Sequence, residues 1–96
     1  MIARVITSQT TPGGLDGFIR FAQEQLPGTQ AQPGFKGCYL LTDRDTGDLV
    51  TISLWNARED VLAVEALAAQ VNEAAKSIEV TPAPAKVYRV EFAHLA

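Results

Sequence analysis

The sequence has few of the residues that build covalent or metal-centred sites. Its 96 residues include one cysteine, Cys38, and one histidine, His94. A single cysteine cannot close a disulfide within the chain, and it has no second cysteine with which to form a metal motif. The pair Gly13–Gly14 lacks the remaining glycines and the lysine of a phosphate-binding loop. We therefore expect neither a metal nor another cofactor.

Basic charge and long apolar runs are also scarce. Eight Lys and Arg residues stand against eleven Asp and Glu residues, whereas affinity for nucleic acid depends largely on clustered basic side chains. The first apolar run ends by Thr7, which is too short for a signal peptide, and no segment approaches the ~18 apolar residues of a membrane span. We expect a cytoplasmic protein with one domain, residues 1–96, that binds neither nucleic acid nor membrane.

Four segments carry the alternation or the β-branched residues that are typical of strands. They are residues 2–8, 35–42, 49–55 and 86–93. Residues 43–48 are rich in Asp and Gly and join the two middle segments, so we expect a β-hairpin there. This turn has a passing likeness to a calcium loop, but the position of the bidentate glutamate is Leu54, which favours a plain solvated turn.

Two further segments repeat with the period of a helix. The first apolar stripe consists of Leu15, Phe18, Ile19, Ala22 and Leu26. We expect Pro27–Gly28 to end this helix and residues 29–34 to form a polar loop. Asn56 is a favourable N-cap residue with Glu59 three positions later, which predicts a second helix over about residues 57–76.

The order of these segments is βαββαβ, which is typical of a ferredoxin-like α+β fold. We expect a four-stranded antiparallel sheet with both helices on one face. The residues expected on that face are Val50, Ile52, Leu54, Tyr88, Val90 and Phe92. The other face is expected near Met1, Ala3, Val5, Leu49, Trp55 and Val87.

The second face is only partly polar, and this predicts how the protein assembles. A fully solvated sheet face should be strongly polar, so a partly apolar one is best covered by another sheet. The sequence therefore predicts a homodimer through the sheet face, in which two sheets form a dimeric α/β barrel. The alternative is a monomer with a mildly apolar exposed sheet.

Residues 33–60 carry a resemblance to a known family. Pro-Gly-Phe precedes the second strand, the third strand ends in Trp55-Asn56, and the next helix starts with the acidic pair Glu59-Asp60. This pattern resembles the antibiotic biosynthesis monooxygenase family, whose ferredoxin-like monomers pair into barrels. The resemblance implies a cofactor-independent monooxygenase that acts on an aromatic or quinone-type molecule. Haem-degrading relatives use a histidine on the second helix, and residues 57–76 contain none, which disfavours that activity.

Four aromatic residues are candidates for lining a substrate pocket. They are Trp55, Tyr39, Phe18 and Phe35. The resemblance implies that Trp55 matches a tryptophan that often lines the cavity between helices and sheet, and the Tyr39 hydroxyl could orient a substrate oxygen. Phe35, Tyr39 and Leu41 are expected on one face of their strand. The alternative for all four candidates is plain core packing, and whether Tyr39 meets Trp55 depends on the register of the hairpin.

His94 and Cys38 are weaker candidates. An imidazole can serve as a general base near neutral pH, but His94 lies close to the C-terminus, where we expect an exposed side chain. Cys38 lies in a predicted strand with only Lys36 as a basic neighbour, which favours a buried, inert thiol. The sequence therefore assigns no catalytic group. A non-catalytic small-ligand-binding or stress-related barrel dimer stays open as an alternative function, and so does a purely structural partner protein.

Overall fold

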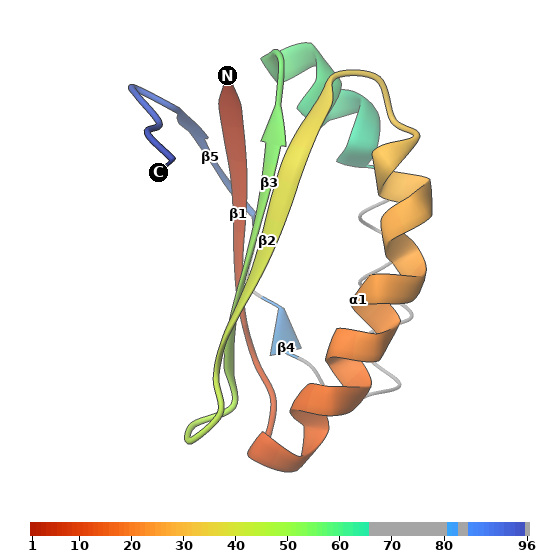
Figure 1. Cartoon of the computed structure of the whole chain (residues 1–96), viewed down its shortest axis with the longest axis vertical. Helices are drawn as coiled ribbons and strands as arrows, with labels where there is room; N and C mark the ends of the chain where they lie inside the picture. Colours follow the sequence, from red (N-terminus) through yellow and green to blue (C-terminus); the bar gives the residue numbers. More distant parts are fainter. Residues whose placement is uncertain (66–80, 83–84, 96) are drawn as a thin grey trace.

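The computed structural model describes residues 1–65, 81–82 and 85–95. Figure 1 shows the described elements around a single sheet. In chain order these are β1 (Ile2–Gln9), the short 3-10 helix η1 (Pro12–Gly14), α1 (Leu15–Gln30), β2 (Phe35–Asp43), β3 (Asp48–Trp55), a helical segment at residues 58–65, β4 (Thr81–Pro82) and β5 (Lys86–Arg89). No described helix is long and apolar enough to cross a membrane.

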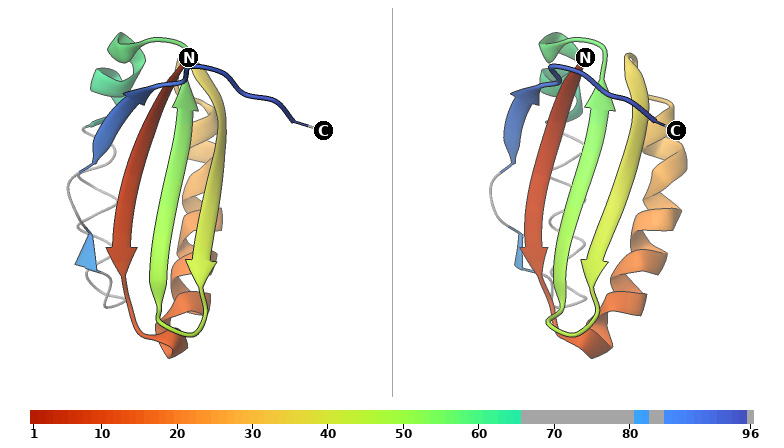
Figure 2. Two further views of the ribbon diagram at one scale, coloured as in Figure 1. Left: turned by 90° about the vertical axis from the view of Figure 1, so that its left-hand side faces the viewer. Right: turned by 60° about the vertical axis from the view of Figure 1, so that its left-hand side comes forward.

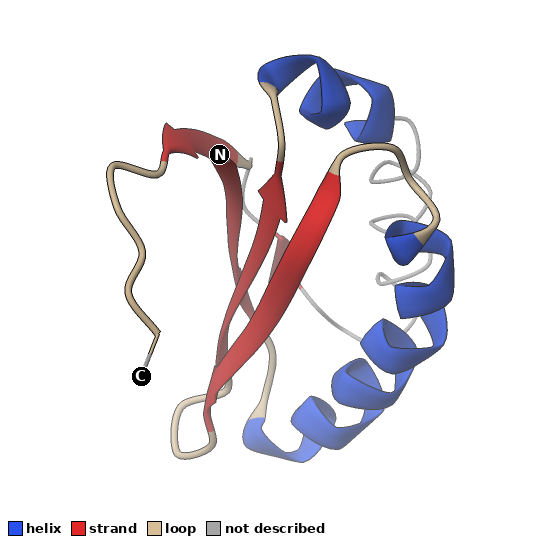
Figure 3. Ribbon diagram, turned by 45° about the horizontal axis from the view of Figure 1, so that its top comes forward, coloured by secondary structure: helices blue, strands red, loops and turns tan. Residues whose placement is uncertain are grey.

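All described strands belong to one antiparallel sheet, in the order β2-β3-β1-β4, and β5 also pairs with β1. β4 and β5 pair with opposite ends of β1, because Ser8 lies opposite Pro82 and Ile2 lies opposite Arg89. Together they occupy the fourth strand position. α1 and the helical segment at residues 58–65 lie on the same side of the sheet (Figure 3). The predicted ferredoxin-like α+β arrangement is therefore confirmed.

The first helix is longer than predicted. α1 continues through Pro27 and ends at Gln30, although proline has no N–H to donate to the preceding turn. The last turn is stabilised by other donors, because the Ala31 N–H donates to the Pro27 carbonyl at 3.2 Å and the Thr29 hydroxyl donates to the Gln25 carbonyl at 3.4 Å. The prediction that the helix ends at Pro27 was therefore wrong.

The last strand is shorter than predicted, since β5 ends at Arg89 rather than at residue 93. Arg89 already lies opposite Ile2, the first residue of β1, so β1 has no further strand residues to pair. One more bond follows, from the Val90 N–H to the Met1 carbonyl at 2.9 Å. Figure 3 shows the chain after β5 on the side of the sheet opposite the helices, and Phe92 there is 87% exposed.

The second helical segment begins as predicted but with a different cap. The residues that are helical at 58–65 agree with the start of the helix predicted over 57–76, whose residues 66–76 lie outside the described part. The Asp60 carboxylate accepts a hydrogen bond from the Ala57 N–H at 3.0 Å. The acidic residue that caps this helix start is therefore Asp60 and not Glu59.

The predicted β-hairpin is confirmed, and its turn is fixed by specific bonds. The Asp43 carboxylate accepts from the Asp45 N–H at 2.9 Å, and Gly47 has a positive φ of 86°. The Thr10 N–H donates to the Gly47 carbonyl at 2.9 Å, and a Cβ added at Gly47 would collide with the Thr10 carbonyl oxygen. The turn therefore packs directly on the end of β1, and only glycine fits at position 47.

On β3 and β5 the two faces of the sheet are the reverse of the predicted ones, whereas Ala3 and Val5 of β1 lie on the face away from the helices, as predicted. Leu49 and Trp55 are each 1% exposed and pack among helix residues, so their side of β3 faces the helices. The face that carries Val50, Ile52 and Leu54 is turned away from the helices. We call it the open face, and Figure 2 views the sheet from that side. Its apolar members are Ala3, Val5, Tyr39, Leu41, Val50, Ile52, Leu54 and Tyr88.

Among the described residues, the core under the helices forms two clusters. One cluster joins α1 to the sheet and contains Leu15, Phe18 and Leu49, with Phe21, Ala22 and Leu40 packed against it. The other joins the helical segment at residues 58–65 to the far end of the sheet. It contains Ile2, Trp55, Val61 and Val64, with Phe35 and Val87 packed against it. Between these clusters the helix-facing side of the sheet carries the polar residues Arg4, Ser53 and Thr51 beside Ile6.

Candidate functional site

A row of polar residues crosses the sheet between the two clusters. Arg4 on β1 lies opposite Ser53 on β3, and Ser53 lies opposite Cys38 on β2, so the three side chains share the helix-facing side. Arg4 and Ser53 are each only 9% exposed, whereas Cys38, near the edge of the sheet, is exposed, so the prediction of a buried thiol was wrong. β2 is an edge strand, so this row, which we call the polar row, is open to solvent at its β2 end.

Trp55 is held against the polar row by a buried hydrogen bond. Its indole Nε1–H donates to the Ser53 Oγ at 2.9 Å. The Phe35 ring packs edge-on against the indole, with ring centroids 5.5 Å apart and an interplanar angle of 75°. A hydroxyl has one proton and two lone pairs, so Ser53 keeps an O–H that it can donate while it accepts from Trp55. The result is a fixed aromatic pair, Trp55 and Phe35, beside a hydroxyl donor; we call this pair the aromatic wall.

Arg4 supplies a buried positive charge next to this wall. Its Nε lies 3.4 Å from the Glu65 Oε1, and its Nη2 lies 3.5 Å from the Glu65 Oε2. Charge-assisted hydrogen bonds are usually about 2.7–2.9 Å long, so this two-pronged contact is loose. The Arg4 side chain is 10% exposed and the Glu65 side chain is 47% exposed. The guanidinium is thus fixed in the interior, while its counter-ion reaches it from the surface.

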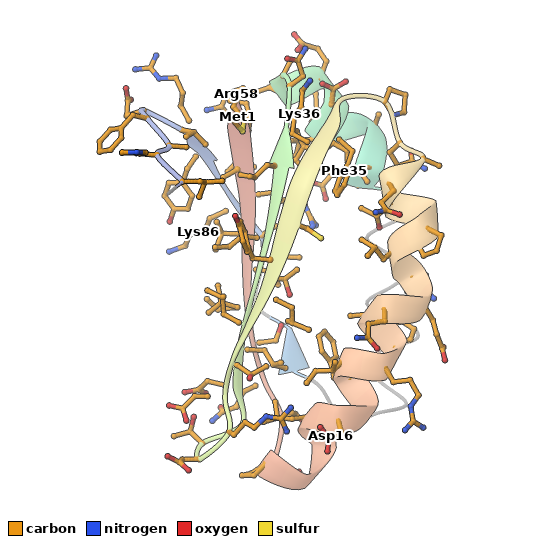
Figure 4. All side chains as sticks on the ribbon, in the orientation of Figure 1. Met1, Asp16, Phe35, Lys36, Arg58 and Lys86 are labelled. Carbon is orange, nitrogen blue, oxygen red and sulfur yellow. The ribbon has the colours of Figure 1, made fainter. Side chains whose placement is uncertain are left out.

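The structure brings only two of the four predicted pocket residues together. Phe35 and Trp55 contact each other, and Figure 4 shows Phe35 on the side of β2 that the helices cover. Phe18 lies in the cluster beneath α1, where its ring centroid is 6.4 Å from that of Phe21. Tyr39 lies opposite Ile52 on the open face and is 47% exposed, so it does not meet Trp55. A pocket-lining role for these residues stays a prediction.

A β-bulge separates Phe35 from Tyr39. Phe35 lies opposite Trp55, but Gly37 rather than Lys36 lies opposite Leu54, so β2 contains one extra residue at this point. Because side chains alternate between faces with a period of two, one extra residue reverses the face of every residue after it. The expectation that Phe35 and Tyr39 share a face was therefore wrong.

The polar row was missed by reasoning from the sequence, although Arg4 carried a signal. It stands between Ile2 and Ile6 on one face of β1, and Ile2 is buried at 8% exposure. A charged residue between two apolar ones on the same strand face is unusual when that face is covered, because a buried charge needs a partner. Glu65 gave no comparable signal, since a carboxylate on a helix is commonly solvated.

The remaining polar candidates lie away from the polar row or lack partners for metal binding. His94 is exposed in the chain after β5. In residues 1–65, 81–82 and 85–95, no group of three or more His, Cys, Asp or Glu side chains could hold a metal ion. The chemistry that the described residues can supply is therefore binding by a buried cation, a hydroxyl and an aromatic wall.

Comparison with known proteins gives a consistent picture. A family model described as antibiotic biosynthesis monooxygenase matches residues 1–76. A search of curated proteins finds no match. Among solved structures, a Deinococcus radiodurans protein provisionally named as an antibiotic biosynthesis monooxygenase has a TM-score of 0.81 at 15% identity, with 100% of this chain and 98% of that chain covered.

Two further solved structures are those of a monooxygenase and a cofactor-independent oxygenase. The ActVA-Orf6 monooxygenase of Streptomyces coelicolor, in complex with nanaomycin D, has a TM-score of 0.78 at 17% identity, with 99% of this chain and 91% of that chain covered. SnoaB, a cofactor-independent oxygenase of Streptomyces nogalater, has a TM-score of 0.77 at 18% identity, with 96% of this chain and 94% of that chain covered. At these identities the likeness establishes the fold.

Proposed function

The chain belongs to the antibiotic biosynthesis monooxygenase family, and on that premise we propose that it is a cofactor-independent monooxygenase acting on an aromatic, quinone-type molecule. One observation carries the proposal: a buried guanidinium and a hydroxyl donor, Arg4 and Ser53, lie beside the aromatic wall of Trp55. Similar folds belong to an oxygenase described as cofactor-independent and to a monooxygenase that binds nanaomycin D, which supports this choice of chemistry.

The proposed reaction uses the polar row to stabilise an ionised substrate. An anthrone-type substrate would enter at the β2 end of the row and place its ring on the Phe35 side of the Phe35–Trp55 pair, with its oxygen near Arg4 and Ser53. Stabilisation of the oxyanion by hydrogen bonds to a charged donor contributes about 1.5–3 kcal/mol and favours loss of a proton from the substrate to water. Arg4 and Ser53 thus bind and orient the anion, and neither acts as a base.

The ionised ring then reacts with O₂ directly. It gives one electron to O₂, and the two radicals combine into a peroxide on the ring carbon. When the peroxide O–O bond breaks, one oxygen stays as the new carbonyl and the other leaves as water with the two hydrogens of the original methylene. The protein contributes a site that favours the anion and holds it next to the aromatic wall, and O₂ supplies the oxidising power.

An oxygen-uptake assay with anthrones and hydroxylated naphthoquinols tests this function. Arg4→Met should lower kcat/KM by about 10- to 100-fold, because it removes a charge-assisted hydrogen bond to the anion. Arg58→Met is the matched control, since Arg58 is exposed, and its kcat/KM should stay within about two-fold of wild type. Equal activity of wild type and Arg4→Met would contradict the proposal, because Arg4 would then not stabilise the substrate anion. Tight ligand binding with no oxygen uptake would support the non-catalytic ligand-binding alternative.

We also propose that the protein is a homodimer through the open face. Tyr39, Leu41 and Tyr88 on that face are each about half exposed, at 47%, 50% and 51%. An uncovered antiparallel sheet face normally alternates to polar residues, so a continuous apolar one favours burial against a second sheet. A cytoplasmic location belongs to the same proposal and is supported by the exposed free thiol of Cys38.

Light scattering coupled to size exclusion tests the dimer. Wild type should have twice the mass of one chain, and Ile52→Lys should have the mass of one chain, because Ile52 lies between Val5 and Tyr39 at the centre of the open face. Thr42→Lys is the matched control, since Thr42 is exposed on the helix-facing side of β2. A wild-type monomer at micromolar concentration would contradict the proposal.

A further inference from the structure

We propose that Glu65 is a displaceable counter-ion that occupies the ligand's position on Arg4, so that the site selects aromatic anions that present two oxygens side by side. This inference rests on the proposed function, because it requires a ligand at the polar row. The first observation is the mode of contact. The two Glu65 oxygens face two different nitrogens of Arg4, Nε and Nη2, which is the fork geometry of guanidinium and carboxylate.

The second observation is that the two partners differ in how firmly they are held. Arg4 lies on β1, which is paired with β3 on one side and with β5 on the other. Its side chain is 10% exposed. Glu65 comes from a helical segment, and its side chain is 47% exposed. The contacts of 3.4 and 3.5 Å are longer than those of a tight pair. The Glu65 side chain can therefore rotate out into the solvent, whereas the Arg4 side chain stays in place.

Selectivity for anions follows from the free-energy cost of leaving the buried Arg4 charge without a counter-ion. A buried charge without a partner is unfavourable, and Glu65 is the partner of Arg4 among the described residues, so displacement of Glu65 is favoured when another anion takes its place. A neutral aromatic ligand cannot replace it. A ligand that replaces both carboxylate oxygens needs two neighbouring oxygens, at least one of which carries negative charge, as in an ionised hydroxyquinone or an aromatic carboxylate. Ser53, which lies opposite Arg4, can donate its O–H to the same oxygen pair.

The position of the pair also sets where the ring of such a ligand would lie. Ser53 connects Arg4 to Trp55, because it is opposite the first and accepts a hydrogen bond of 2.9 Å from the second. Trp55 itself is 1% exposed, so the ring of an anion bound at Arg4 would lie beside Ser53 and the exposed Cys38, one hydrogen bond away from the indole. Glu65 thus marks the position of the charged end of the ligand, and the β2 end of the polar row marks the position of its ring.

Quenching of tryptophan fluorescence measures the binding, since Trp55 is the one tryptophan of the chain. The probes are lawsone, a hydroxynaphthoquinone that is anionic at neutral pH, its neutral methyl ether, and naphthoate. Glu65→Gln should bind lawsone or naphthoate roughly two- to five-fold more tightly than wild type, because the part-exposed Glu65 carboxylate no longer competes with the ligand for Arg4. Its affinity for the methyl ether should not change. Glu65→Asp, which keeps the charge but has a shorter reach, should change in the same direction.

Glu59→Gln is the matched control for net charge, since Glu59 is exposed on the same helical segment. Tightening with lawsone identifies an ionised hydroxyquinone as the ligand class, and tightening with naphthoate alone identifies an aromatic carboxylate. If Glu65→Gln binds the anions no more tightly than Glu59→Gln does, while Arg4→Gln weakens them, the role of Glu65 is overturned and the proposed function stands. If neither wild type nor Glu65→Gln binds any probe, both proposals fall.

Discussion

Replacement of Ser53 by alanine probes the hydrogen bond that fixes Trp55 beside the polar row. The indole Nε1–H is buried, and Ser53 is its acceptor at 2.9 Å. Loss of the acceptor leaves a buried donor unpaired, which costs about 1–3 kcal/mol of unfolding free energy. For a domain of this size, each kcal/mol corresponds to about 4–8 °C in Tm. We therefore expect Ser53→Ala to lower Tm by roughly 4–24 °C.

A double-mutant cycle with Trp55→Phe isolates this bond from the other effects of each change. Phenylalanine has no N–H, so Ser53→Ala in that background should cost less than about 0.5 kcal/mol, and the coupling free energy should be about 1–2 kcal/mol. Urea unfolding followed by far-UV circular dichroism measures all four proteins at one fixed concentration, because assembly links stability to concentration. Ser8→Ala on β1 is the control. Equal costs of Ser53→Ala in the two backgrounds would refute the reasoning.

Two further substitutions test the contact between the hairpin turn and the end of β1. Gly47→Ala should lower the unfolding free energy by about 1–3 kcal/mol, because it combines a positive φ of 86° with a collision at the Thr10 carbonyl. Gly13→Ala is its control, since a Cβ at Gly13 would have open space around it, and its unfolding free energy should change little. Thr10→Val should raise the unfolding free energy by about 1 kcal/mol, because the Thr10 Oγ1 is buried without a partner among the described residues. Thr42→Val, at an exposed position, is its control, and thermal unfolding measures both pairs. An unchanged Tm for Gly47→Ala, or a lower one for Thr10→Val, would contradict these expectations.

The order of elements could be read from the sequence because it depends on local periodicity. The choice of face could not, since Val50, Ile52 and Leu54 are as apolar as the side of β3 that carries Leu49 and Trp55. Local alternation identifies two faces but does not say which one the helices cover. That choice depends on long-range packing.

The candidate site was only partly predictable for a related reason. Trp55 and Phe35 could be singled out by residue type, and they do lie together. Arg4 could not be assigned, because its partner Glu65 is 61 positions away and only the fold brings the two side chains together. The end of β5 was equally non-local, since it is set by the point at which β1 begins.

The extra residue in β2 has a consequence for how this protein can change. Because of it, one edge strand places Phe35 among the helices and Tyr39 on the open face. A substitution at Tyr39 can therefore change the open face without disturbing the aromatic wall, and a substitution at Phe35 can reshape that wall while the open face stays intact. A single extra residue thus lets one strand contribute to two surfaces of the sheet that can change independently.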